Sequence, residues 1–116
     1  MNYLNIEKET LKNKNYRKVI HTTDEQQLVL MSLNPGEDIP PEIHEDTTQF
    51  FRIEQGEGIA IVNKKVYVLE NGIALTVPPN TSHYIKQIGS KPLKLYTIYS
   101  PPEHPKNRVN VRQPQL

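Results

Sequence analysis

The 116-residue chain is predicted to be an all-β domain, built as a sandwich or barrel of short strands. Ten prolines and five glycines divide it into short apolar segments. No segment sustains the spacing of three to four residues between apolar side chains that marks an amphipathic helix. Turn signals recur about every eight to twelve residues, as in all-β folds. We therefore expect less than about a tenth of the chain in helix, against about one third in an average globular domain.

Each expected strand is a short apolar run that ends at a polar connection or at one containing Gly or Pro. In chain order the expected strands are Tyr16–Thr22, Gln27–Leu33, Ile39–His44, Thr48–Glu54, Gly58–Val62, Val66–Leu69, Ile73–Val77, His83–Gln87 and Leu93–Tyr99. The clearest connections are Thr23–Glu25, Asn34–Gly36, Asn63–Lys65, Glu70–Gly72 and Gly89–Pro92. Residues 1–100 are thus expected to form one domain. Residues 101–116, rich in Pro, Asn and Gln, are expected to form a tail that lies over the barrel or is partly disordered.

Composition narrows the range of functions. Fourteen basic and thirteen acidic side chains nearly cancel, which favours neither a nucleic-acid partner nor an acidic tail. Two short basic stretches, Lys12–Lys18 and Lys106–Arg112, are interpreted as solvated surface. The chain has no cysteine, so disulfides and thiolate ligands are excluded, and a soluble, cytoplasmic protein is expected. Its longest apolar runs are far shorter than the ~20 residues that cross a bilayer, so no membrane partner is expected.

Two fragments carry polar residues at offsets that suit one site. The first is Gly36-x5-Glu42-x-His44-x4-Gln49-x6-Gly56, and the second is Gly72-x5-Pro78-Pro79-Asn80-x2-His83. Alternation along a strand places Glu42 and His44 on the same side. If residues 45–48 form a four-residue hairpin loop, His44 stands directly across from Gln49.

The same alternation predicts an apolar wall beneath these polar groups. Phe51 and Ile53 share a face with Gln49, and Ile85 shares one with His83. A few convergent polar groups above an apolar lining are typical of a small-molecule pocket. His104 joins the candidate pocket if its proline-stiffened segment folds back to the barrel mouth. His21, on an early strand, is interpreted as structural.

Two imidazoles, a carboxylate and an amide oxygen suit a divalent ion such as Zn²⁺, Mn²⁺, Fe²⁺ or Ni²⁺. Glu42, His44, Gln49 and His83 are therefore the candidate metal ligands. Two alternatives stay open: the same residues line a metal-free pocket, or they form a purely structural hydrogen-bonded cluster.

The two fragments, 36–56 and 72–87, resemble the two motifs of the cupin superfamily, in which the first supplies two His and a Glu and the second a third His. Here Glu42 stands for the first His, Gln49 for the Glu, and Asn80 for a glycine. The exchange of Glu and Gln keeps one carboxylate in the set. The resemblance implies a double-stranded β-helix, or jelly-roll, barrel, and a homodimer.

Residues 42–52 and 93–105 further resemble small single-domain cupins of the mannose-6-phosphate isomerase-like kind. This resemblance implies a metal-dependent sugar-phosphate isomerase, although one fold hosts many activities. Isomerisation also requires a base, and no catalytic residue is assigned. The alternative is a non-catalytic cupin that binds a small polar ligand.

Overall fold

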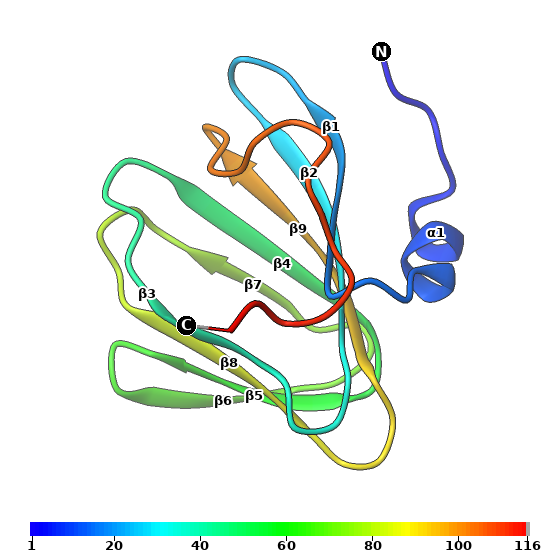
Figure 1. Cartoon of the computed structure of the whole chain (residues 1–116). Coiled ribbons are helices and arrows are strands. Elements are labelled where there is room, and N and C mark those ends of the chain that lie inside the picture. The colour runs from blue at the N-terminus through cyan, green and yellow to red at the C-terminus, as the bar shows by residue number, and fades with distance from the viewer. Residues whose placement is uncertain (116) are drawn as a thin grey trace.

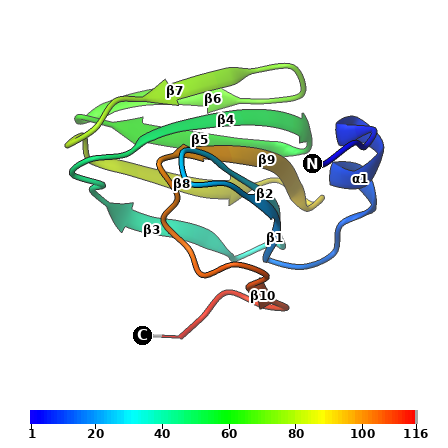
Figure 2. The same ribbon diagram turned by 90° about the horizontal axis from the view of Figure 1, so that it is seen from above.

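The computed structural model describes residues 1–115; Leu116, the last residue of the expected tail, lies outside the described residues. Two antiparallel sheets pack face to face (Figures 1 and 2). The six-stranded sheet has the order β10-β1-β2-β9-β4-β7, and the four-stranded sheet has the order β3-β8-β5-β6. The strands are β1 (Arg17–Thr22), β2 (Gln27–Leu33), β3 (Asp38–Glu42), β4 (Thr48–Gln55), β5 (Glu57–Val62), β6 (Lys65–Leu69), β7 (Ala74–Val77), β8 (His83–Ile88), β9 (Leu93–Ser100) and β10 (Val109–Asn110). This mostly β, two-sheet architecture confirms the predicted jelly-roll class.

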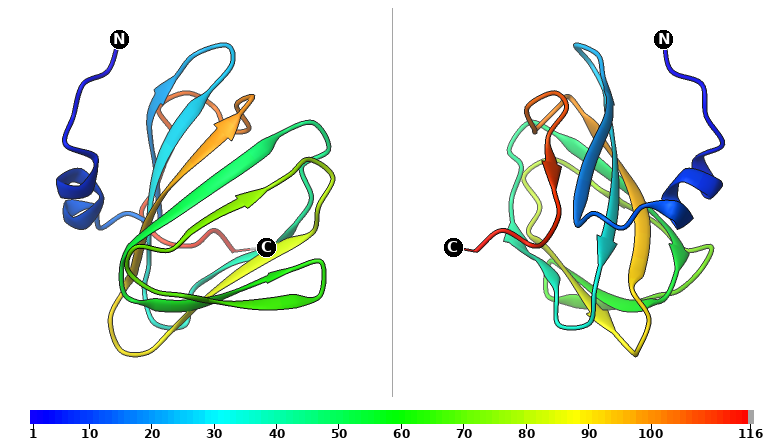
Figure 3. Two further views of the ribbon diagram at one scale, coloured as in Figure 1. Left: turned by 180° about the vertical axis from the view of Figure 1, so that it is seen from behind. Right: turned by 45° about the vertical axis from the view of Figure 1, so that its right-hand side comes forward.

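The core lies between the two sheets and is built from alternate residues of their strands. Side chains that are at most 2% exposed come from both sheets, namely Val29, Met31, Phe51, Ile53 and Leu95 from the larger sheet and Ile39, Ala60 and Ile85 from the smaller. On β4 the buried residues alternate from Gln49 to Ile53, as the period of two predicts. The strands curve around this common interior (Figure 3).

All nine expected strands are present, with ends within two residues of those predicted. The larger discrepancy is in how they pair. β3 belongs to the four-stranded sheet and β4 to the six-stranded sheet, so the connection between them is not a hairpin and His44 does not stand across from Gln49 in a strand pair. The chain passes from one sheet to the other here, a non-local arrangement that strand periodicity does not encode.

The chain changes sheets again between β4 and β5, at Gly56. Its φ is +89°, and an added Cβ would lie 2.5 Å from the Pro92 carbonyl oxygen. Only glycine fits this corner, both in backbone conformation and in space.

Helix α1 (Ile6–Lys12) is the one helix of residues 1–115, and no expected element corresponds to it. The Asn5 side chain caps it by accepting from the Lys8 amide at 3.0 Å. At the other end, Lys94 Nζ on β9 donates to the carbonyls of Leu11 and Asn13 at 2.8 and 2.6 Å. Seven residues are too few to show a helical period, so the helix depends on its caps and on the sheet. No helix among the described residues is long and apolar enough to span a membrane.

The tail lies over the barrel. β10 pairs with β1, and the buried side chain of Gln27 on β2 holds the main chain of residues 103 and 104. Gln27 Nε2 donates to the His104 carbonyl at 2.7 Å, and its Oε1 accepts from the His104 amide at 3.0 Å. Within the described residues 101–115, the segment therefore packs against the barrel.

Candidate metal centre

Glu42 and His83 are neighbours across β3 and β8. Glu42 Oε1 lies 3.1 Å from His83 Nε2, and His83 Nδ1 lies 3.3 Å from the Thr81 carbonyl oxygen. Both ring nitrogens of this buried imidazole therefore face oxygen acceptors. A neutral imidazole has one N–H, so donation from Nδ1 to Thr81 leaves the Nε2 lone pair beside a carboxylate. A cation shared by Nε2 and Glu42 would stabilise that arrangement.

His44 lies two residues beyond the end of β3, in the connection to β4. Its Nε2 is 3.2 Å from the same Glu42 Oε1, and its ring centroid is 5.4 Å from that of His83. The His44 carbonyl accepts from the Asn80 amide at 2.7 Å. Asn80 has φ +59°, a left-handed conformation that Asn tolerates better than most residues. Asn therefore fills the backbone role of the glycine that the family motif carries here.

Gln49 approaches from the other sheet, on β4, and is 1% exposed. Its Nε2 donates to Thr97 Oγ1 at 3.0 Å, so the amide oxygen is the atom directed away from Thr97. Gln49 Oε1 and His44 Nε2 are both buried, and neither has a hydrogen-bond partner among the described residues. The 3.2 Å contact of His44 with Glu42 is therefore close but poorly aligned. Two buried ligand atoms without partners are costly unless a bound group satisfies them.

The expected apolar wall consists of core residues. Phe51, Ile53 and Ile85 are each at most 1% exposed. Phe51 presents its ring edge to His83, with centroids 5.9 Å apart. Phe51 therefore supports the His83 imidazole, and Ile53 and Ile85 belong to the same buried core. Their role as a ligand-contacting wall remains a prediction.

His104 lies at the same end of the barrel, but Tyr99 stands between it and the cluster. Its Nε2 is 3.2 Å from the Tyr99 hydroxyl, and the Tyr99 ring in turn meets His44 edge-on, with centroids 5.8 Å apart. Burial, aided by the positive charge of Arg17, lowers the pKa of His104 to about 4. His104 therefore supports the site through Tyr99. His21, interpreted as structural, pairs with Leu28 across β1 and β2.

Glu103, which no sequence pattern singled out, is a carboxylate that the tail brings to His44. Glu103 Oε2 lies 3.7 Å from His44 Nδ1, and its Oε1 accepts from the hydroxyl of buried Thr47 at 2.6 Å. A carboxylate facing the outer nitrogen of a metal-binding histidine fixes the orientation of the ring. The available signal was its position just after the last long strand, in the same proline-rich segment as His104.

The cluster is electrostatically coupled. Burial raises the pKa of Glu42, but the close contacts with His44 and His83 and the positive charge of their rings outweigh burial and lower that pKa to about 2. The pKa of His44 is raised, chiefly by contact with Glu42 and against the effect of burial, with smaller contributions from Glu103 and Gln49. Without metal, the site therefore favours a carboxylate beside a protonated imidazole.

This coupling predicts a pH window for the metal-free protein. Glu42, with its pKa lowered from 4.5 to about 2, contributes stability above pH 4.5 that is lost as the pH falls toward 2. His44, with its pKa raised from 6.5, contributes stability below pH 6.5 that is lost as the pH rises through the raised value. The difference in unfolding free energy between wild type and Glu42→Gln should therefore be largest between pH 4.5 and 6.5. Urea unfolding of metal-stripped proteins at several pH values tests this, and a difference independent of pH would contradict it.

Glu42, His44 and His83 form a group that can hold a metal ion, with ligand atoms all within 4.8 Å of one another. Bonds of 2.0 to 2.2 Å to a common ion put neighbouring ligand atoms roughly 3 to 3.6 Å apart. The two contacts of Glu42 Oε1, at 3.1 and 3.2 Å, match that range. One carboxylate and two imidazoles are ligand types that suit a borderline divalent ion.

Removing the carboxylate of Glu103, which faces His44 but is not a proposed ligand, should weaken metal binding. Glu103→Gln keeps an acceptor for Thr47 but removes the negative charge that faces His44. We expect the affinity for Zn²⁺ to fall by about tenfold, the lower end of the usual effect of such partners. Glu45→Gln, one residue after His44 and exposed, makes the same charge change and is the control. Equal losses in both variants, measured by competition with a chromogenic chelator, would reduce the effect to net charge.

The chain was compared with known proteins. The model of the cupin domain matches residues 29–99. An uncharacterized protein of Acanthamoeba polyphaga mimivirus is 49% identical over 116 residues, covering 97% of this chain and 72% of its own length. An uncharacterized protein of Bacillus subtilis is 42% identical over 113 residues, covering 92% of this chain. The chain spans only 61% of that Bacillus protein.

Among solved structures, a crystal structure of a Bacillus halodurans protein superposes with a TM-score of 0.93 at 37% identity, covering 96% of this chain and 89% of that one. A structure described as KdgF from Halomonas sp. has a TM-score of 0.71 at 22% identity, with 75% and 78% coverage, and shows the fold alone. The family model extends from the middle of β2 to the penultimate residue of β9 and includes every candidate ligand. The chain belongs to the cupin family.

Proposed function

We propose that this protein is a metal-binding cupin whose ligands are Glu42, His44 and His83, with the amide oxygen of Gln49 as the fourth. The observation that carries the proposal is the pair of buried, partnerless ligand atoms, His44 Nε2 and Gln49 Oε1, beside the Glu42 carboxylate. A purely structural cluster would leave the Gln49 oxygen without a partner and would join His44 Nε2 to Glu42 only by a poorly aligned contact of 3.2 Å. The ion is Zn²⁺, Mn²⁺, Fe²⁺ or Ni²⁺, which these ligand types do not distinguish.

The ligand proposed for this centre is a small polyhydroxylated or carboxylated molecule. A divalent ion bound here would supply a Lewis acid for carbonyl, hydroxyl or carboxylate oxygens. The chain itself holds the imidazoles in fixed orientations, through Thr81 for His83 and Glu103 for His44. Phe51, whose ring edge meets His83, borders the cluster from the buried side.

If the site is catalytic, we propose isomerisation of a sugar phosphate, as in mannose-6-phosphate isomerase-like cupins. That reaction needs a base to move a proton between adjacent carbons. Glu103 is the nearest candidate, with its side chain 32% exposed, but one of its oxygens is already bonded to Thr47. Arg52 pairs with Glu54 at 3.4 Å, on the side of β4 away from Gln49. It therefore does not serve as a phosphate clamp at this site.

Because the groups that could act as a base already bond to other protein groups, we favour the second candidate, a cupin that binds a small polar ligand without turning it over. Glu103, Tyr99 and His104 are each engaged with another protein group. Elemental analysis of the purified protein, followed by assays on mannose 6-phosphate and fructose 6-phosphate with and without chelator, tests both. Metal with turnover supports the isomerase. Metal without turnover, together with a compound that raises the melting temperature, supports the binding protein, and absence of metal under all loading conditions contradicts the centre itself.

We also propose a homodimer formed through a sheet edge. The edge strand β6 exposes Val66, Tyr67 and Val68 at 62, 43 and 68%, and unpaired apolar edges favour pairing with another strand. Light scattering at micromolar concentration should give twice the chain mass of 13.4 kDa. A monomer mass would contradict this.

A further inference from the structure

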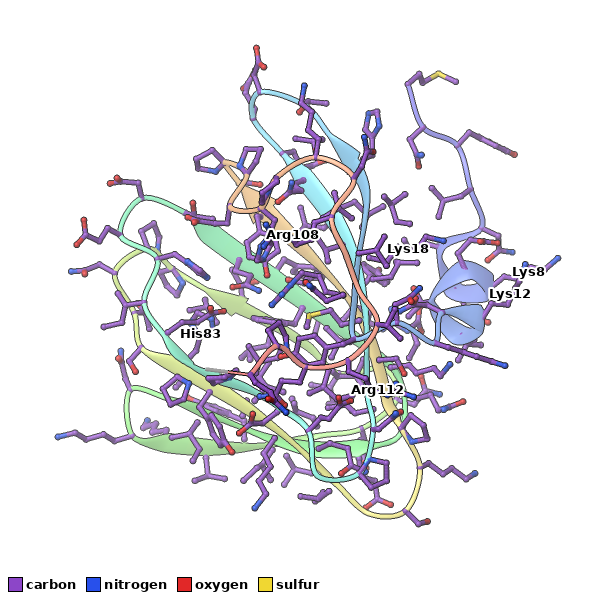
Figure 4. The ribbon with its side chains drawn as sticks, viewed as in Figure 1. Lys8, Lys12, Lys18, His83, Arg108 and Arg112 are labelled. Atoms are coloured by element: carbon purple, nitrogen blue, oxygen red, sulfur yellow. The ribbon has the colours of Figure 1, made fainter. Side chains whose placement is uncertain are left out.

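The two short basic stretches near the chain ends become a single surface in the structure. β1 pairs with β10, placing Lys18 opposite Val109 and Arg17 opposite Asn110. The pairing is reinforced by Val19 N donating to the Arg108 carbonyl at 2.9 Å and by Arg17 Nη1 donating to Asn110 Oδ1 at 3.0 Å. Figure 4 shows Lys8, Lys12 and Lys18 near α1 and β1, Arg112 on the adjacent tail, and His83 on the other side of the barrel.

Two hollows lie on this surface, and Lys14 lines both. The first, of about 310 Å³, also has Lys12 and Lys18 in its wall. The second, of about 260 Å³, also has Lys94 and Arg112. We call the two together the Lys14 groove. Each hollow is close to the lower limit of size for small-molecule sites, about 300 Å³.

The positive charge of the Lys14 groove is largely uncompensated. Glu9 is the one acidic residue that lines it, and it lies 3.9 Å from exposed Lys12. Within residues 1–115, no ion pair involves Lys14, Lys18 or Arg112. The whole chain has a formal charge of only +1, so the combined charge of Lys14, Lys18 and Arg112 exceeds the net charge of the protein.

One cation of the groove, Lys94, is held in a fixed position by hydrogen bonds to the main chain. Lys94 is 9% exposed, and its ammonium covers the carbonyls at the end of α1, which would otherwise repel an anion. Burial, and then the charge of Lys14, lower the pKa of Lys94. The two cations therefore repel each other in the free protein, and a bound anion would relieve that repulsion.

We propose that the Lys14 groove binds a small phosphorylated molecule, with anionic groups held by Lys14, Arg112 and Lys18. A polynucleotide suits the surface less well, because nucleic-acid binders carry an extended basic stripe and this groove is short and interrupted by Glu9. The groove is separate from the metal centre, so the proposal does not depend on the function proposed above.

Pyrophosphate is a suitable probe, titrated calorimetrically into protein freed of metal by a chelating resin, because pyrophosphate also binds metal ions. We expect 1:1 binding that weakens as NaCl rises. The double variant Lys14→Gln/Arg112→Gln should bind at least tenfold more weakly. The matched control, Lys64→Gln/Lys65→Gln, removes the same charge from exposed residues at the turn between β5 and β6, on the far side of the barrel from α1 (Figure 1).

A second measurement does not depend on any variant. Amide chemical shifts of the wild-type protein should move on pyrophosphate addition at residues 12–18 and 110–113, and not around residues 63–65. Equal losses in the two double variants, absence of binding, or shifts confined to other residues would overturn the proposal. Tighter binding of a single-stranded DNA oligonucleotide than of pyrophosphate at equal ionic strength would also overturn it, in favour of a polyanion surface.

Discussion

His44→Ala is expected to lower the affinity for Zn²⁺ or Mn²⁺ by about 100-fold or more. Loss of even an outer partner of a metal ligand costs roughly 10- to 100-fold, and this variant removes a proposed ligand itself. The loss also leaves Glu42 with one imidazole neighbour in place of two. Affinity is measured by competition with a chromogenic chelator, and occupancy by elemental analysis after loading.

Two further variants make this result specific. His21 lies on β1 and is not a proposed ligand, so His21→Ala should leave the affinity for the metal ion unchanged. His83→Ala should act like His44→Ala, but His83 is 1% exposed, so its folding must first be checked by thermal unfolding. The His44 side chain is also mostly buried, at 14% exposed, so folding of the His44 variant is checked in the same way. Unchanged metal affinity in a folded His44→Ala protein would exclude His44 as a ligand and contradict the proposed ligand set.

Phe51→Ala is expected to produce the largest loss of stability, about 3 to 5 kcal/mol in the free energy of unfolding. Phe51 is 1% exposed and contacts the interior between the sheets, so its removal leaves a cavity in addition to losing buried apolar surface. Urea unfolding with an unchanged denaturant slope would report this directly.

Phe50 is the matched control, because it is the same residue type one position earlier on the same strand. It points to the opposite face of β4, is only partly buried, and meets Tyr96 with ring centroids 6.4 Å apart. Phe50→Ala should therefore cost clearly less than Phe51→Ala. Because the Phe51 ring also abuts His83, Phe51→Ala should weaken metal binding, whereas Phe50→Ala should not. An equal or larger loss of stability in Phe50→Ala would contradict the assignment of the core face.

Local features of the sequence were enough to predict nine of the ten strands, whereas β10, a short strand within the expected tail, was not predicted. Alternation along β4 places Gln49, Phe51 and Ile53 on one face, and turn residues such as Asn34 and Gly36 mark the strand ends. Capping and packing cannot be inferred in this way. Helix α1 exists because Asn5 caps one end and Lys94, from a strand more than 80 residues later in the chain, caps the other.

The site was predictable to the extent that family spacing groups Glu42, His44, Gln49 and His83. What spacing cannot convey is which sheet each residue comes from. A local hairpin was expected to bring His44 to Gln49. Instead, Gln49 belongs to the other sheet and approaches the cluster because the two sheets pack face to face. Glu103 was missed for the same reason: its contact with His44 spans 59 positions, and it depends on Gln27 holding the tail. Whether Gln49 binds a metal remains a prediction.

The pairing of Glu42 with His83 across β3 and β8 has a consequence for the order of events during synthesis. The two residues are separated by 41 positions, so a growing chain exposes Glu42 and His44 well before it contains His83. Glu103 emerges later still, after β9. Non-local strand pairs of this kind form slowly, and a lone carboxylate and imidazole hold an ion weakly. The barrel should therefore close before metal is captured, and the ion that occupies the centre would be set by the metals available where folding finishes.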